Sequence, residues 1–119
     1  QSEHHEPHGG IVPNVATRAL ARAMGVPHAG EVLQPISLLS KAPALPFAGN
    51  LDGKSVALFQ LDRVRDKAGD TVQAADHSGT PGSYEAFEQD RAFIQSWLAG
   101  EAALVTDPYA VLKTPPLPK

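Results

Sequence analysis

The dipeptide Asp52-Gly53 and the apolar run behind it constrain the fold of this chain more than any other feature of its sequence. Asp-Gly favours a tight turn, because the central positions of such a turn need positive φ angles. The residues that follow, SVALFQLDRV over 55–64, include β-branched and aromatic side chains and have the length of a strand. We therefore predict a strand around 55–64. If Phe47-Ala48 pairs back across the turn, residues 46–64 form a hairpin.

A second pattern predicts a helix from about Tyr84 to Leu98. Ser83 is suited to the N-cap, Glu85 places a negative charge in the first turn, and Gly100 ends the helix. We expect the apolar stripe to pack on a small sheet and the charged side to face water. The stripe consists of Phe87, Phe93, Ile94, Trp97 and Leu98, and the charged side of Glu85, Glu88, Asp90 and Arg91.

The position of Trp97 has two interpretations. As a core residue, it should cost about 3–5 kcal/mol of stability when replaced by alanine. The alternative is an exposed aromatic groove that binds a partner.

Weaker signals mark the remaining elements. Asn14 can cap a short helix from Val15 to Met24, which Gly25 would end. We predict short strands at 36–39 and 103–105, and a loop over 66–83 from its glycine-rich and polar composition.

The length of 119 residues suits one domain, while 11 prolines and 10 glycines predict long irregular stretches. The expected fold class is α+β: a small β-hairpin or sheet packed by one long and one short helix, with Pro-rich irregular segments. We divide the chain into a disordered His-rich arm (1–10), a single small domain (11–112) and a Pro-rich tail (113–119).

Charge and composition exclude several classes of function. The net charge is −3 and basic residues form no large cluster, so we expect no nucleic-acid partner. The chain has no cysteine, which removes disulfides, thiol catalysis and cysteine-type zinc sites. No apolar run approaches the length of a transmembrane helix, so we expect no membrane span.

The N-terminal histidines are the only candidate metal ligands that the sequence gathers together. His4, His5 and His8, with Glu3 and Glu6, offer suitable residue types. Pro7, Gly9 and Gly10 disfavour a helix there, and a flexible arm must lose entropy to chelate. The favoured interpretation is therefore adventitious metal binding or a plain solvated arm, and no cofactor is expected.

No catalytic constellation is evident elsewhere. His77 beside Asp76 or Asp70 could be a base and its orienting acid, but loop neighbours of this kind are usually only solvated. No serine sits in a G-x-S-x-G motif, and no phosphate-binding glycine loop occurs. We therefore name no catalytic residue, and an enzymatic activity is the less favoured interpretation.

The order of the expected elements resembles the C-terminal region of membrane-anchored periplasmic parvulin-type foldases, the PpiD-like proteins. The resemblance covers about residues 15–106: a short helix, the Asp52-Gly53 turn, the strand VALFQLDRV, the charged exit RDKAGD, a long helix and a short strand. The Gly/Ser loop at 78–83 departs from the family's pattern, and the parvulin catalytic histidines and glycine signature are absent. The resemblance implies a non-catalytic scaffold or client-binding part and carries over no site residue.

The chain begins at the polar segment QSEHHEPHGG, so we expect a processed mature protein, periplasmic or secreted, or a fragment of a longer exported protein. The favoured function is a non-enzymatic protein-binding or chaperone-type module with a protein or peptide partner. One alternative is a subunit or propeptide-like segment of a larger assembly. The other is a small metal-dependent enzyme that uses the N-terminal histidines.

Overall fold

A computed structural model of the chain describes residues 2–4, 14–66, 68–76 and 79–118. Helices and short strands are arranged in an α+β fold, which confirms the predicted fold class. The central strand is β4 (Leu58–Leu61), which lies between β1 (Ser2–His4) and β2 (His28–Ala29) and runs parallel to both. Residues 2–4, expected to be part of an irregular arm, are therefore an edge strand.

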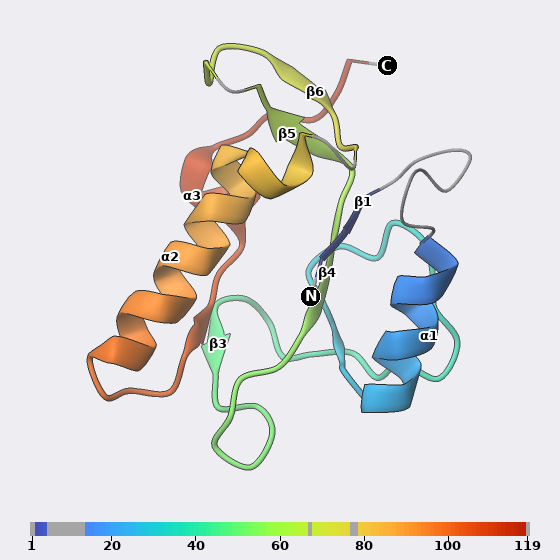
Figure 1. Cartoon of the computed structure of the whole chain (residues 1–119), viewed down its shortest axis with the longest axis vertical. Helices are drawn as coiled ribbons and strands as arrows, with labels where there is room; N and C mark the ends of the chain where they lie inside the picture. The colour runs from blue at the N-terminus through green and yellow to red at the C-terminus, as the bar shows by residue number, and fades with distance from the viewer. Residues whose placement is uncertain (1, 5–13, 67, 77–78, 119) are drawn as a thin grey trace.

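Two helical layers flank this sheet (Figure 1). Helix α1 (Asn14–Met24) lies on one side, and α2 (Tyr84–Leu98) lies on the other together with the short helix α3 (Pro108–Leu112). Two small antiparallel pairs extend the β-structure: β3 (Phe47–Ala48) with β7 (Leu104–Val105), and β5 (Arg63–Arg65) with β6 (Val72–Ala74).

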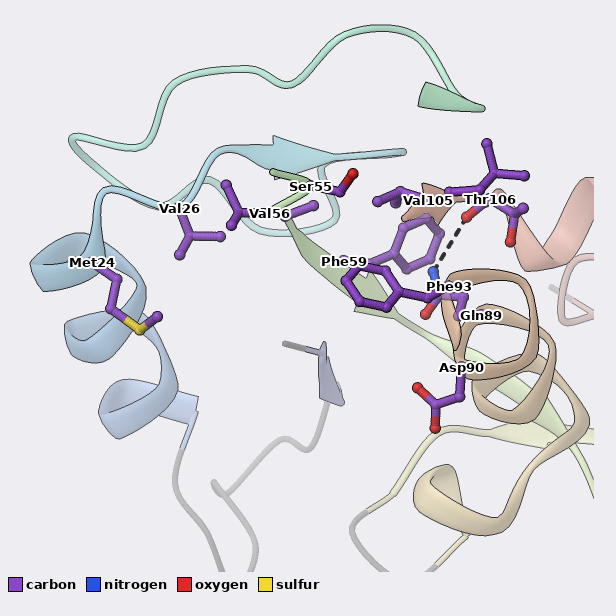
Figure 2. A pocket seen from close by; sticks show the side chains of 12 residues that line it. Met24, Val26, Ser55, Val56, Phe59, Gln89, Asp90, Phe93, Val105 and Thr106 are labelled. Atoms are coloured by element: carbon purple, nitrogen blue, oxygen red, sulfur yellow. Dashed lines mark hydrogen bonds between the residues drawn. The ribbon is translucent and has the colours of Figure 1, made fainter. Parts of the chain in front are cut away.

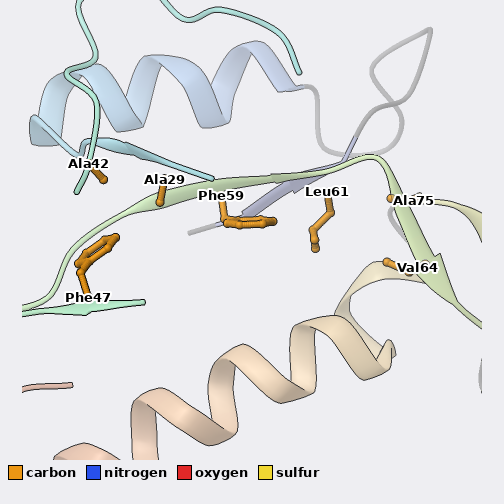
Figure 3. Packing of buried hydrophobic residues seen from close by; sticks show 7 residues of the cluster. All are labelled: Ala29, Ala42, Phe47, Phe59, Leu61, Val64 and Ala75. Carbon is orange, nitrogen blue, oxygen red and sulfur yellow. The ribbon is translucent and has the colours of Figure 1, made fainter. Parts of the chain in front are cut away.

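All four residues of β4 are buried, because the strand has a layer on each face. Side chains alternate between the faces of a strand. Leu58 accordingly packs with Ala21, Val26 and Ile36 toward α1. Phe59 and Leu61 point toward α2, as Figure 3 shows, in a cluster completed by Ala29, Ala42, Phe47, Val64 and Ala75.

The predicted hairpin over 46–64 is wrong. Leu51 and Lys54 exchange both backbone hydrogen bonds around Asp52-Gly53, so the turn itself is present. The backbone groups of Val56 are then bound by the Asn50 side chain, at 2.8 and 2.9 Å, and are not free to pair with Phe47-Ala48. The strand β3 pairs with β7 instead.

The predicted strand over 55–64 is also shorter than expected. It divides into β4 and β5 at Asp62, where Tyr109 Oη accepts hydrogen bonds from the amides of Asp62 and Arg63 at 3.2 and 3.3 Å. Residues 55–57 before β4 lie outside any strand.

Two other expectations fail for local reasons. Residues 36–39 form a turn closed by Leu39 N–H to Ile36 O at 3.4 Å, with Leu38 at a φ of 70°. The predicted loop over 66–83 contains β6 and a 3₁₀ turn, η1 (Thr80–Gly82). Asp66 starts the β5–β6 turn: its N–H donates to Thr71 O at 2.8 Å, and its carboxylate accepts from Asp70 N–H at 3.0 Å.

The helix boundaries agree with the sequence. Helix α2 starts after Ser83, whose Oγ accepts a hydrogen bond from Ala86 N–H at 3.2 Å, and is followed by Gly100 at a φ of 83°. Helix α1 ends before Gly25, also at positive φ. The division into arm, domain and tail stays a prediction, although the first tail residues are not free: Thr114 is buried.

Candidate functional site

Helix α2 presents its large apolar side chains to solvent and its acidic side chains to the protein. Glu85, Glu88 and Ala92 are its buried residues. The side chains of Phe87 and Trp97 are 66% and 65% exposed, and Phe93, Ile94 and Leu98 are exposed as well. The predictions that the apolar stripe packs on the sheet, that Trp97 is a core residue, and that Glu85 and Glu88 face water are therefore wrong.

Glu85 explains part of this orientation, because hydrogen-bond donors inside the protein bind its carboxylate. Its Oε2 accepts a hydrogen bond from Arg65 N–H in β5 at 2.9 Å, and its Oε1 accepts from the Thr114 hydroxyl at 2.6 Å. The Arg65 guanidinium lies 3.8 Å away. A buried carboxyl group is tolerated when it is hydrogen-bonded and close to a cation. Glu85 thus ties the start of α2 to β5 and to the C-terminal tail.

One helical turn further along, Glu88 is also turned inward and is covered by Arg91. The guanidinium donates two hydrogen bonds to the carboxylate, at 2.8 Å from Nε and 2.5 Å from Nη2, and a third to Gln95 Oε1 at 2.7 Å. The hydrogen bonds from Arg91 hold the pKa of Glu88 below its ordinary value, more than its burial raises it.

The middle of the inner face of α2 is small and polar, which lets the helix approach β7 closely. Ser96 Oγ accepts a hydrogen bond from Leu104 N–H at 2.7 Å and donates to Ala92 O at 2.7 Å. Gln89 reaches Thr106 O at 3.4 Å. These polar contacts, together with those of Glu85 and Glu88, hold this side of α2 on the protein, and the apolar stripe faces outward.

We call the exposed side of this helix the outer face of α2. It is an apolar surface interrupted by one acidic and one basic side chain, and its members are Tyr84, Phe87, Asp90, Arg91, Ile94, Trp97 and Leu98. Each aromatic side chain has roughly 150–250 Å² of surface, of which about half to two-thirds is exposed here, so the three aromatics alone contribute on the order of 350 Å². That is within the range of the largest patch on an ordinary monomer, and such patches are often binding surfaces.

A pocket of about 250 Å³ opens beside this helix, between α1, β4 and β7. Figure 2 shows Met24 of α1 on one side of it, and Asp90 and Phe93 of α2 on the other. Phe59, Val56 and Val105 contribute to its apolar lining. The buried Oγ1 of Thr106 in this lining has no hydrogen-bond partner among the described residues.

A wider, shallow groove of about 710 Å³ lies at the C-terminal end of the same helix. Phe93, Ile94 and Trp97 form its helical side, and the Asp52-Gly53 turn region contributes Gly53 and Lys54 to the other side. Ile94 and Trp97 belong both to the outer face of α2 and to this groove, so the outer face continues into concave surface at this side. The arrangement agrees with the alternative that placed Trp97 in an exposed aromatic binding groove.

The structure leaves the histidine hypothesis a prediction. His5, His8 and His77 lie outside the described residues, and His4 belongs to β1. His28 is buried in β2. Across the part of the chain that the structure describes, no three histidine or acidic side chains gather as a metal site would require.

In comparisons with protein-family models, curated proteins and solved structures, the chain matches none of them. No helix within the described ranges has the length and apolar character needed to cross a membrane. The resemblance to PpiD-like foldases and the periplasmic or secreted location stay predictions. The sequence pattern predicts the apolar stripe of α2 but not its orientation. The signal for the inward side is the pair of acidic residues at 85 and 88, together with the alanine at 92.

Proposed function

We propose that this chain is a non-enzymatic protein-binding module and that it binds through the outer face of α2. The observation that carries the proposal is the inverted orientation of this helix: Phe87 and Trp97 are about two-thirds exposed, whereas Glu85 is fully buried. Exposing these side chains forgoes roughly 1.5–3 kcal/mol for each. An occupant that covers them would recover that free energy.

The shape of the surface favours a polypeptide over a small molecule. Small ligands bind in concave pockets that enclose most of their surface. The outer face of α2 is the convex side of a helix of 15 residues, about 22 Å long at 1.5 Å per residue. Aromatic anchors on an extended surface, with hollows beside them, are typical of protein interfaces.

The experiment uses Trp97, the only tryptophan of the chain, as the reporter. In the dilute chain we expect emission typical of a water-exposed indole and efficient acrylamide quenching. A polypeptide isolated with the chain from its own source should shift the emission to shorter wavelength and protect Trp97 from the quencher.

Two variants locate the binding. Phe87→Ser alters the outer face of α2 and should abolish both the blue shift and the association. Val15→Ser replaces an equally exposed apolar side chain on α1 and should leave them unchanged. A blue-shifted, protected Trp97 in the dilute chain would contradict the proposal, as would binding that Phe87→Ser leaves intact.

A further inference from the structure

We infer that the polypeptide covering the outer face of α2 inserts a basic side chain, an arginine or a lysine, into the pocket between α1, β4 and β7. The inference rests on the proposed function and names the chemistry of the partner. Its basis is an unpaired negative charge at the pocket, together with the pocket's lining and size.

Asp90 connects the pocket to the binding surface. It belongs to the outer face of α2 and also lines the pocket, and in Figure 2 its carboxylate projects from α2 toward the side where α1 lies. The side chain is exposed, and its carboxylate has no hydrogen-bond or ion-pair partner among the described residues. A polypeptide on the outer face of α2 therefore meets a free carboxylate at this pocket.

The charge of the pocket is negative, because no cation balances Asp90. Among the described residues that line the pocket, none is a lysine, an arginine or a histidine. The next residue in the sequence, Arg91, already donates to Glu88 and Gln95. Complementary charge selects a partner, since a like charge in an interface is costly. The pocket therefore favours a positive group and disfavours a negative one.

The other polar groups of the pocket also suit a hydrogen-bond donor. Gln89 donates its amide to Thr106 O, and its Oε1 has no partner within the described part of the chain. The Oγ1 of Thr106 is likewise buried without a partner there. Guanidinium and ammonium groups are donors only, and a guanidinium has five N–H groups to share among several acceptors. A basic side chain thus matches both the charge and the acceptors of the pocket.

The remaining lining is mostly apolar, which suits the stem of a long basic side chain. Arginine and lysine bury their methylene groups against apolar surface while the charged end stays with polar groups. Phe93 lies on the same helix as Asp90, and an aromatic ring also attracts a cation. The larger apolar side chains of the lining are Met24, Val26, Val56, Phe59, Phe93 and Val105.

The size of the pocket fits one side chain. Its volume is about 250 Å³. An apolar cavity of roughly 150 Å³ holds one benzene molecule, and sites for drug-sized ligands enclose roughly 300–1,000 Å³. A pocket between these limits suits a single long side chain. Arginine seated in a pocket is a frequent anchor of protein interfaces.

Blocked amino acids test the pocket directly. N-acetyl-arginine amide is compared with N-acetyl-citrulline amide, which has nearly the same shape but no charge, and with N-acetyl-glutamate amide, which is negative. NMR titration measures binding at the amides of Val105 and Thr106. We expect the arginine probe to bind at least about threefold more tightly than the citrulline probe, and the glutamate probe to bind most weakly.

Two variants separate the charge of the pocket from its apolar lining. Asp90→Asn should lower the affinity of the arginine probe to that of the citrulline probe and leave citrulline binding unchanged. Phe93→Ala should weaken both probes alike. Glu101→Gln removes an exposed carboxylate at the neighbouring groove and, as the matched control, should keep the wild-type preference for arginine. Circular dichroism shows that each variant keeps the fold.

The polypeptide isolated with the chain then links the pocket to the interface. Its affinity for the outer face of α2 should fall at least about tenfold in Asp90→Arg, because the reversed charge repels the basic side chain. Glu31→Arg makes the same reversal at an exposed position outside α2 and outside the pocket, and should leave the affinity unchanged.

Equal affinities for the arginine and citrulline probes would overturn the inference, and so would a preference for arginine that Asp90→Asn leaves intact. A polypeptide that Phe87→Ser releases but Asp90→Arg does not would also overturn it, while the proposed function would stand. Polypeptide binding that Phe87→Ser leaves intact would contradict the proposed function and, with it, the source of the basic side chain, even where the arginine probe prefers the wild-type pocket.

Discussion

Phe87 and Glu88 are neighbours in the sequence, yet the phenylalanine is 66% exposed and the glutamate only 8% exposed. Consecutive residues of a helix differ by about 100° around its axis, so two neighbours can lie in very different surroundings. In this pair the acid is the buried member, and Arg91 pairs with it. This choice leaves an apolar helix face for a partner.

Replacing Trp97 should cost the monomer almost nothing. Trp97→Ala is expected to change the free energy of unfolding by less than about 0.5 kcal/mol, because the ring is exposed. Phe59→Ala, in the buried cluster beneath α2, should cost about 3–5 kcal/mol. Urea unfolding followed by circular dichroism at low concentration measures both, and equal losses would contradict the orientation of α2.

Replacing Glu85 should destabilise the fold although the change is nearly isosteric. In Glu85→Gln one of the two carboxylate oxygens is replaced by an amide nitrogen, which cannot accept a hydrogen bond. Either Arg65 N–H or the Thr114 hydroxyl therefore loses its acceptor. Leaving one buried donor unpaired costs about 1–3 kcal/mol. Glu101→Gln is the matched control at an exposed site and should be neutral. Faster hydrogen exchange at the Arg65 amide would identify the broken contact.

Gly30 should not tolerate a methyl group. It has a φ of 75°, and an added Cβ would lie 2.5 Å from Cε2 of the buried Phe59 ring. Gly25 has a similar φ of 65° but nothing within 4 Å of such a Cβ. Both alanine variants carry about 1–2 kcal/mol of backbone strain. Gly30→Ala should lose a further 1–3 kcal/mol or so from overpacking. Equal thermal stabilities for the two variants would contradict the contact with Phe59.

Tyr109 should make the protein sensitive to alkali. Burial raises the pKa of its hydroxyl well above the ordinary value of 10, since the ionised form would be poorly solvated beside Asp62. The unfolded chain therefore ionises first, so the stability that Tyr109 contributes is present below about pH 10 and falls above it by up to about 1.4 kcal/mol per pH unit.

Tyr109→Phe tests this pH dependence. The variant should lose about 1–3 kcal/mol at pH 7, because the amides of Asp62 and Arg63 lose their acceptor. Above pH 10 its stability should fall less steeply than that of the wild type. Tyr84→Phe, which keeps Tyr109, is the control and should retain the wild-type slope. Parallel alkaline slopes for wild type and Tyr109→Phe would contradict the assignment.

The sequence predicted well those features that depend on a few adjacent residues. The Asp52-Gly53 turn, the Ser83 cap and the glycines that follow α1 and α2 lie where their local backbone preferences place them. The short strand near residues 103–105 is present as β7. The α+β class follows from these local signals and is confirmed.

Signals from a few adjacent residues do not predict which strands pair with each other. Phe47-Ala48 joins a strand more than fifty residues away, because Asn50 occupies the backbone of the nearer candidate. The β5–β6 pair was missed because glycine and charged residues around its turn resemble an ordinary loop.

By itself, the sequence determined that residues 84–98 form a helix with one apolar and one charged side, because helix formation and capping depend on neighbouring residues. Only the tertiary structure decided which side faces the protein. Hydrophobicity alone favours burying the aromatic stripe. The hydrogen-bond donors of Arg65 and Thr114, which belong to segments distant in sequence, stabilise the burial of Glu85 instead. The candidate binding surface arises from that long-range competition.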